Sequence, residues 1–252
     1  MVDEIVKKQC DTLLQLQNDL ADNLVSKGVE ASSDEKFNTL VPKVLNINYK
    51  DTSVEDSIVD GTLIEYENDR ITIVGKYAFA YRAQLTTVIL PQVTILTNGA
   101  FYNCYELVNI TIPNLVTLAP SCFSGCKQIP QIYQTKAETI GDTALWNCAC
   151  TSVLFGNAKT IGTNLLLANT RCNTIVLCGD EMCTLSGSLS GSFANEGKYV
   201  YVKKDLIEEY EQATNWSAYA GQFRAIEDYL TEITEIFPLF PTDFPQFFES
   251  EV

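Results

Sequence analysis

One short phrase of apolar and small residues recurs five times in the central part of the chain. Each copy ends at a phenylalanine or a leucine, and successive ends are almost equally spaced. The phrases end at Phe79, Phe101, Phe123, Leu145 and Leu166. A fixed period in this range is typical of solenoids, in which each repeat buries its apolar face against its neighbours. The pattern therefore predicts a stack of about five repeats of roughly 22 residues.

A second apolar column follows each phrase and marks a short strand. Nine positions after the phrase end stand Val88, Ile110, Ile132, Leu154 and Ile175. Two positions further on, Leu90, Ile112 and Leu177 are apolar as well. Alternation over every second residue is typical of a strand with one buried face. Stacking the repeats would lay these strands side by side as a parallel sheet, with each phrase forming a turn on the opposite side.

The residues eight and ten positions after each phrase end are expected to face outward on this sheet, because side chains alternate along a strand. They are Thr87, Ile89, Asn109, Thr111, Gln131, Tyr133, Val153, Phe155, Thr174 and Val176. A row this rich in exposed apolar side chains would form a large patch. Two alternatives stay open: the row binds a ligand or partner, or a neighbouring subunit or the chain's own tail covers it.

Residues 1–47 are predicted to be helical and to serve anchoring or oligomerisation. Apolar residues repeat by sevens there, at Val6, Leu13 and Leu20, and Leu24 lies on the same stripe. The stripe would either pair with copies of itself, with a trimer favoured, or fold back on the body. Residues 48–60 are polar and are predicted to form a linker. After it, Thr62–Tyr66 and Arg70–Val74 are expected to pair as a hairpin that covers the first repeat.

Residues 231–252 form an acidic tail rich in phenylalanine and proline. Its aromatic residues are Phe237, Phe240, Phe244, Phe247 and Phe248. Proline disfavours regular helix and sheet, so an extended course is expected. Five phenylalanines would be poorly soluble if left free, which favours docking into a groove on another protein or a sister subunit. A disordered terminus is the alternative.

Charge is concentrated at the two ends of the chain. The net charge is −15; residues 1–60 hold 12 acids and 6 bases, residues 61–199 hold 9 and 8, and residues 200–252 hold 11 and 3. Nucleic-acid binding requires a basic surface, so this class is excluded. No apolar run is long enough to predict a membrane-spanning helix, and the stretch 1–25 does not read as a secretory signal.

Candidate chemistry is sparse. The chain has no histidine, which excludes histidine-based triads and bases, and no phosphate-binding glycine loop follows a strand, so we expect no enzyme. Cys104, Cys126 and Cys148 share one repeat position, three after the phrase end. A stacked column of small apolar groups explains them better than a metal or redox ladder. We therefore expect no metal site and no cofactor.

The repeat I-G-x-x-A-F-x-x-C-x-x-L-x-x-I-x-I-P resembles the BspA-like class of leucine-rich repeats, most clearly in LTNGAFYNCYELVNITIP at 96–113. The resemblance implies an α+β fold. It consists of an N-terminal helical segment, a leucine-rich-repeat domain over 61–230 with short parallel strands, and a C-terminal strand-helix cap. In the cap, Tyr199–Val202 would be the last strand. An amphipathic helix would follow with Leu206, Ile207 and Tyr210 facing inward, and Trp216 and Tyr219 would seal the end.

The stretch 1–70 resembles the start of bacteriophage tail-fibre and related virion proteins that carry such repeats. This second resemblance implies a non-enzymatic virion protein, assembled in the host cytoplasm, that serves as a fibre or appendage component. Its partners would be other virion proteins, a host cell-surface protein or glycan, and copies of itself. The alternatives are a bacterial surface or secreted adhesin with the same repeats, or a purely structural virion decoration protein.

Overall fold

The computed structural model of the protein describes residues 63–190, 193 and 196–248. The predicted helical segment 1–47, with Val6, Leu13, Leu20 and Leu24, and the linker 48–60 lie outside these residues.

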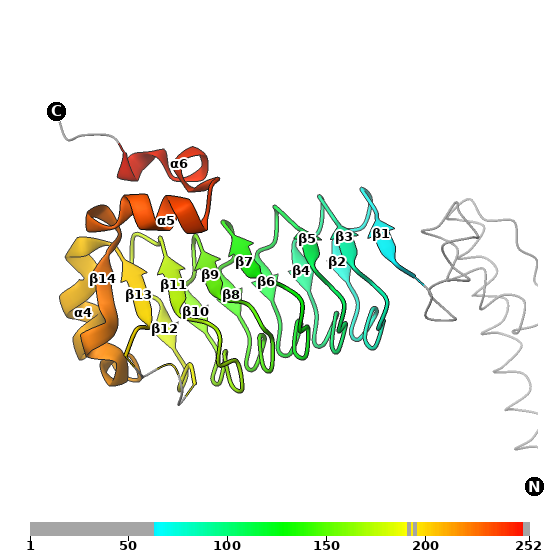
Figure 1. The fold of residues 1–252 in the computed structure, drawn as a ribbon, viewed down its shortest axis with the longest axis horizontal. Coiled ribbons are helices and arrows are strands. Elements are labelled where there is room, and N and C mark those ends of the chain that lie inside the picture. Colours follow the sequence, from blue (N-terminus) through cyan, green and yellow to red (C-terminus); the bar gives the residue numbers. More distant parts are fainter. Residues whose placement is uncertain (1–62, 191–192, 194–195, 249–252) are drawn as a thin grey trace, which may run out of the picture. The chain divides into compact units, whose positions relative to one another are not determined.

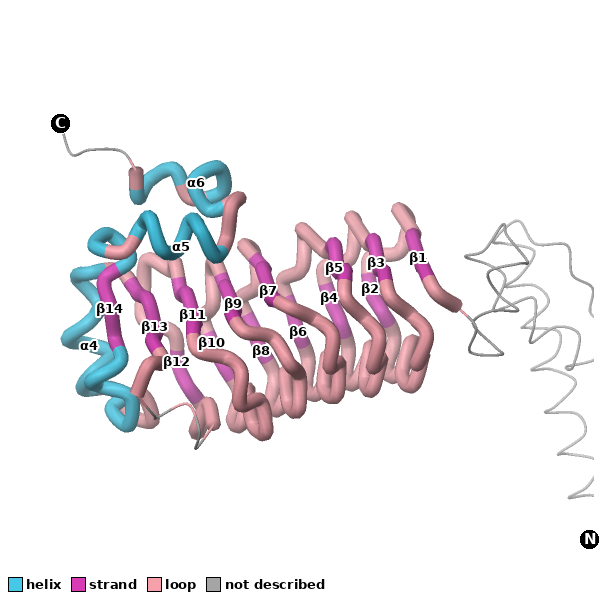
Figure 2. Tube along the Cα trace, in the orientation of Figure 1, coloured by secondary structure: helices cyan, strands magenta, loops and turns pink. Residues whose placement is uncertain are grey.

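From β1 to β12, each turn of the chain contributes one strand to each of two layers, and all strand pairs are parallel (Figures 1 and 2). The front layer consists of β1 (Glu65–Glu67), β3 (Thr87–Ile89), β5 (Asn109–Thr111), β7 (Gln131–Gln134), β9 (Ser152–Phe155), β11 (Thr174–Leu177), β13 (Tyr199–Val202) and β14 (Phe223–Ala225). The back layer consists of β2 (Ile73–Val74), β4 (Ile95–Leu96), β6 (Thr117–Leu118), β8 (Thr139–Ile140), β10 (Thr160–Ile161) and β12 (Thr184–Leu185). This confirms the predicted parallel solenoid.

The core between the layers is built from stacked columns of identical or similar residues. The rings of Phe79, Phe101 and Phe123 stack with centroids 5.1 and 5.5 Å apart and interplanar angles of 7° and 13°. Leu145 and Leu166 continue the same column, and all five side chains are buried. Because each repeat covers the next, no single turn could bury this column alone.

The turns that follow the back strands share two backbone positions with positive φ. The first position is occupied by Tyr77, Gly99, Ser121, Thr143 and Asn164, and the second by Tyr81, Asn103, Gly125, Asn147 and Ala168. Only two of these ten residues are glycine, so the repeat geometry imposes a left-handed conformation that most side chains avoid. The turn must therefore be held by its neighbours, through bonds such as Tyr77 N–H to Asn98 O at 3.1 Å.

The predicted hairpin at the start of the repeats is wrong. β1 pairs with β3 and β2 pairs with β4, so the two segments lie in different layers of the first turn. The residues between them include Asn68, whose side chain accepts the backbone N–H groups of Arg70 and Ile71 at 2.9 and 3.1 Å. This turn redirects the chain toward the back layer instead of reversing it beside β1.

The structure confirms a C-terminal cap that consists of a strand followed by helices. After β13 come η2 (Lys204–Leu206), α4 (Ile207–Gln212) and η3 (Ser217–Gln222). Tyr210, Trp216 and Tyr219 are buried, and the Trp216 indole donates to the Cys183 carbonyl at 2.7 Å. The last strand is β14, however, which pairs with β13.

The tail forms short helices, so the expected extended course is wrong. After η4 (Ile226–Asp228) it contains α5 (Leu230–Ile236), α6 (Phe240–Asp243) and η5 (Pro245–Phe247). Pro241 and Pro245 lie in the first turn of α6 and of η5, where the missing amide hydrogen costs no helical hydrogen bond.

Candidate functional site

The tail lies across the front layer and covers its C-terminal half (Figure 1). Leu154, Val176 and Tyr201, from β9, β11 and β13, are buried in one cluster with four tail side chains. These tail residues are Ile233, Phe237, Phe240 and Phe244. Phe247 packs against the cluster, whereas Phe248 is 44% exposed. The sequence left open whether the outward row binds a partner or is covered by a neighbouring subunit or the chain's own tail. In this half of the front layer, the chain's own tail covers the strands.

Three side-chain hydrogen bonds fix the tail on the strands. The Gln131 amide donates to the Ile236 carbonyl at 2.8 Å, and the Tyr201 hydroxyl donates to Glu232 at 2.8 Å. The Tyr133 hydroxyl donates to Asp243 at 2.6 Å. Burial and the neighbouring Asp243 carboxylate both raise the pKa of Tyr133, so this hydroxyl stays a donor.

Two residues predicted to face outward point into the core instead. Val153 is paired with Ile132, and Leu154 with Tyr133, so Val153 and Phe155 lie in inward columns and are fully buried. The interval from β7 to β9 is one residue shorter than the interval from β3 to β5. Because side chains alternate along a strand, a shift of one residue exchanges the inward and outward faces. Leu154 therefore takes the outward position. Thr174 and Val176 keep the outward register but are buried.

The front layer stays accessible on β1, β3 and β5. Asn109 and Thr111 are exposed, and Thr87 and Ile89 are partly exposed. The Asn109 amide donates to the Thr87 hydroxyl at 3.4 Å, which links neighbouring rungs. We call these three strands the open face.

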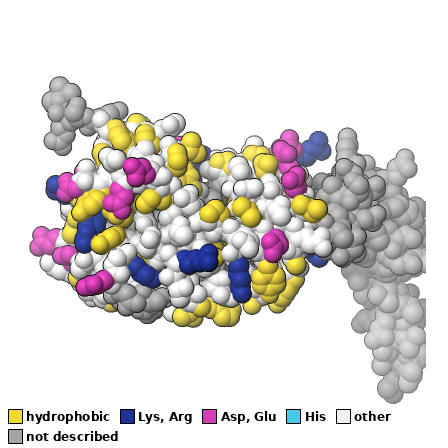
Figure 3. Space-filling view, viewed as in Figure 1, with side chains coloured by type: hydrophobic (Ala, Val, Ile, Leu, Met, Phe, Trp, Pro, Cys, Tyr) yellow, Lys and Arg dark blue, Asp and Glu magenta, His cyan; other side chains and the backbone are white. Residues whose placement is uncertain are grey.

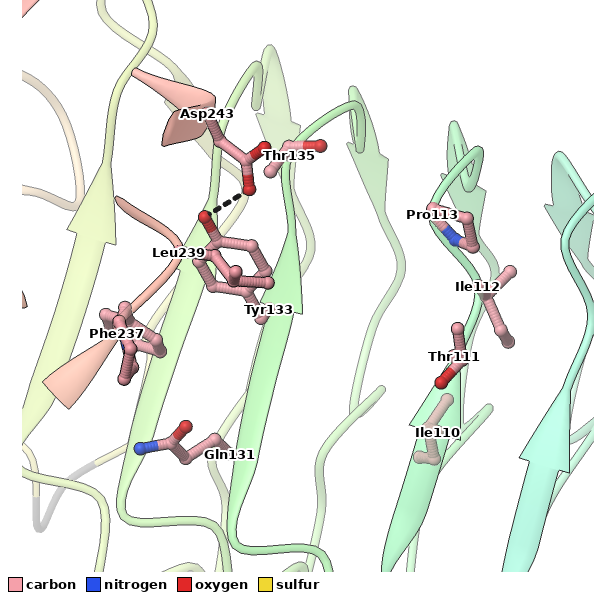
Figure 4. A pocket seen from close by; sticks show the side chains of 11 residues that line it. Ile110, Thr111, Ile112, Pro113, Gln131, Tyr133, Thr135, Phe237, Leu239 and Asp243 are labelled. Carbon is pink, nitrogen blue, oxygen red and sulfur yellow. Dashed lines mark hydrogen bonds between the residues drawn. The ribbon is translucent and has the colours of Figure 1, made fainter. Parts of the chain in front are cut away.

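A groove of about 430 Å³ separates the open face from the tail (Figure 4). One wall comes from β5 and the residues after it, with Ile110, Thr111 and Pro113. The opposite wall combines β7 and the tail, and its residues are Gln131, Tyr133, Thr135, Phe237, Pro238, Leu239 and Asp243. Figure 4 shows the Tyr133 ring beside Leu239, with its hydroxyl bonded to Asp243. We call this hollow the central groove.

The hydrogen-bond ladder of the front layer is interrupted beneath the central groove. β5 pairs only with β3, and β7 only with β9, whereas the back strands β6 and β8 remain paired. In other turns the residue before the strand donates its amide to the preceding turn, as in Val108 N–H to Thr86 O at 2.9 Å and Thr151 N–H to Pro130 O at 2.9 Å. Pro130 has no amide hydrogen at this position. Its ring therefore breaks the ladder.

A second hollow lies on the turn side of the solenoid and was missed by the sequence reasoning. Its volume is about 870 Å³, and its lining residues are Tyr77, Ala80, Tyr81, Tyr102, Ser121, Thr143, Trp146 and Leu167. None of them is charged. Tyr77 and Tyr81 are 53% and 65% exposed although both have positive φ. Apolar side chains gather along this edge in Figure 3. We call it the turn-side surface.

Part of the chain is similar to known proteins. Residues 62–173 match the family described as the BspA type leucine rich repeat region, in six copies. The parallel solenoid described above is a leucine-rich-repeat-like fold. A solved leucine-rich repeat protein from Bacteroides ovatus is similar, with 17% identity and a TM-score of 0.45. The match covers 56% of this chain and 39% of the solved one. No curated protein matches the chain.

The cysteines of the solenoid pack in its interior, as the sequence predicted for Cys104, Cys126 and Cys148. All eight cysteines in the described part are buried free thiols. Cys104 and Cys126 donate through Sγ to the carbonyls of Phe79 and Phe101 at 2.9 and 3.1 Å. Among the described residues, no group of three His, Cys, Asp or Glu side chains could hold a metal, and no helix is long and apolar enough to span a membrane.

These thiols are expected to resist alkylation in the folded protein. Burial raises the pKa of Cys122 and Cys183 to about 12, from an ordinary value of 9.0. In a Cys10→Ser variant, which removes the cysteine outside the described residues, iodoacetamide at pH 8 should label the folded chain at least ~100-fold more slowly than the unfolded chain. The measurement is mass spectrometry against time, with the guanidinium-unfolded variant as control. Rapid labelling of the folded chain would contradict the packing.

The raised pKa values of Cys122 and Cys183 predict that the protein loses stability at alkaline pH. Thiols with a raised folded-state pKa stabilise the fold fully below pH 9, the value in the unfolded chain. This contribution is lost as pH rises from 9 toward 12, because only the unfolded chain ionises in that window.

Proposed function

We propose that this protein is a non-enzymatic attachment protein that holds a partner on its open face and in the central groove. The observation that carries the proposal is the central groove, formed where the uncovered strands meet the docked tail. The strands around it are held by stacked turns, so binding requires little ordering of the protein. A leucine-rich-repeat solenoid suits protein–protein interaction or adhesion for the same reason.

We further propose that the protein is a fibre or appendage component of a bacteriophage virion, assembled in the host cytoplasm. The support is the resemblance of the stretch 1–70 to virion proteins that carry such repeats. Its partners would be other virion proteins together with a host cell-surface protein or glycan. The competing proposals are a bacterial surface or secreted adhesin and a structural decoration protein.

Immunogold electron microscopy with antibodies against the purified chain tests this placement. Cells that encode the chain are induced to release particles, and both particles and cell envelopes are examined. Label on particle tails or fibres is the expected result. Label confined to the bacterial envelope would favour the adhesin, and evenly distributed label on capsids would favour the decoration protein.

The virion proposal includes a trimer formed by residues 1–47. In light scattering coupled to gel filtration, the full chain should have three times its monomer mass of 28.0 kDa, and a chain without 1–47 should be a monomer. Leu13→Glu in the full chain should also give a monomer, because a charge in the apolar stripe opposes pairing. Asp11→Glu is the matched control and should remain trimeric. A monomeric full chain would contradict the oligomer.

The turn-side surface supports a second candidate function, adhesion to a neutral glycan. Exposed aromatic rings beside hydroxyl groups, with no charge in the lining, match the alternating apolar faces and hydroxyls of a sugar. Tyr81→Ala should lower retention on a glycan array at least ~10-fold. Tyr105→Ala, which is exposed outside this hollow, is the control and should bind normally.

A further inference from the structure

We propose that the central groove binds an extended peptide segment of a partner protein, whose main chain pairs with the unbonded edges of β5 and β7. The inference rests on the proposed function and specifies its partner. It combines three observations: the broken ladder, the apolar wall beside it and the charge at its rim.

The register shows which backbone groups face the break. Asn109 N–H bonds to Thr86 O, and Leu90 N–H bonds to Thr111 O, so the odd-numbered residues of β5 pair with β3. Hydrogen bonds alternate in direction along a parallel strand, so the amide and carbonyl of Ile110 point toward β7.

The same reasoning applies to β7. Thr151 N–H bonds to Pro130 O, and Gly156 N–H bonds to Gln134 O, so the even-numbered residues pair with β9. The backbone groups of Gln131 and Tyr133 consequently point toward β5. Among the described residues, no backbone hydrogen bond joins β5 to β7. Two strand edges thus face each other with donors and acceptors that only water or a ligand can satisfy.

Strand edges of this kind are recognised by added strands. Main-chain hydrogen bonds supply affinity, and alternate side chains enter pockets. The central groove has such a pocket, because the Tyr133 and Phe237 rings lie 5.5 Å apart and Leu239 is 61% exposed beside them. A peptide in the groove should therefore place an apolar or aromatic side chain against these three residues.

Charge at the rim indicates a basic flank on the peptide. Asp243 is the one charged side chain among the lining residues; Lys136 follows the lining Thr135, and its ammonium is bonded to Asn114 at 2.5 Å. The exposed Glu65 and Glu67 of β1 add negative charge to the same open face. Complementary charge on a partner steers association and fixes register, so a lysine or arginine beside the apolar anchor is expected.

Selection from a library of random linear dodecapeptides on the full chain tests the proposal. Enriched peptides should combine an apolar anchor with a neighbouring basic residue. Their affinity is then measured by fluorescence anisotropy with single N-methyl groups placed along the backbone. Methylation of any amide in the middle of the bound segment should lower affinity at least ~10-fold, because successive amides face β5 and β7 in turn, whereas methylation near the peptide ends should have little effect.

Two substitutions in the protein locate the binding site. Thr111→Trp fills the groove wall and should lower affinity at least ~10-fold; Thr139→Trp, an exposed threonine of the back layer, is the matched control. Pro130→Thr supplies the amide that other turns have, and should lower affinity while leaving circular dichroism unchanged. This variant separates loss of the site from loss of the fold.

Four outcomes would overturn the inference: no peptide is enriched, N-methylation in the middle of the peptide leaves affinity unchanged, Thr111→Trp binds normally, or only peptides copied from the stretch 1–62 of this chain bind. The last outcome would make a second copy the occupant. If one of these outcomes occurs but antibodies label particle tails, the peptide inference fails and the virion placement stands. If peptides are selected but no particle is labelled, the virion placement fails and the peptide inference stands.

Discussion

Replacing Phe101 by alanine is expected to destabilise the protein by about 3–5 kcal/mol. The ring is fully buried between Phe79 and Phe123, with centroids 5.1 and 5.5 Å away. Its removal leaves a cavity and also breaks the contact between two neighbouring turns. In a solenoid this contact couples the turns on either side, so unfolding should also become less cooperative.

Urea denaturation followed by circular dichroism measures the effect. Phe101→Leu is the conservative control and should cost only about 1 kcal/mol, because the change keeps most of the volume. The protein itself uses leucine at the equivalent positions 145 and 166. Tyr102→Ala, at the adjacent and partly exposed position, is a second control. Equal losses for Phe101→Ala and Tyr102→Ala would contradict the stacked column as the main source of stability.

Replacing Phe240 by alanine is expected to release the tail from the front layer. Phe240 is fully buried and its ring centroid lies 5.1 to 6.1 Å from those of Phe244, Phe247 and Phe248. Loss of about 3 kcal/mol from tail docking corresponds to a roughly hundredfold larger population of the released state. The repeats themselves should remain folded, because the core between their layers does not include the tail.

Limited proteolysis with an endoprotease specific for glutamate detects the release through cleavage after Glu232 and Glu235 in α5. Phe248→Ala is the matched control, since this ring is 44% exposed and should contribute little. Binding of a hydrophobic dye should rise in Phe240→Ala as Leu154, Val176 and Tyr201 become uncovered. Unchanged cleavage in Phe240→Ala, or equal cleavage in both variants, would contradict the docked tail.

Some features of the site were readable from local sequence and others were not. The outward positions on β3, β5 and β7 followed from strand alternation, and the register holds there because the repeat interval stays constant. The slip at β9 was missed because Val153, Leu154 and Phe155 are all apolar, so alternation could not indicate which face each one takes. The ladder break had a signal, a proline where neighbouring turns need an amide donor. The turn-side surface had one too, in the tyrosines of the first turn.

The sequence by itself determined the repeat period, the core columns and the C-terminal cap, because these depend on contacts between equivalent positions of neighbouring turns. The tertiary structure decided where the tail goes, which strands it covers and which it leaves open. Those contacts join Phe237 and Phe240 to strands far away in the chain. The repeat period contains no information about where the tail docks. Docking depends on how well the shape and apolar surface of the tail fit the surface of the folded strands.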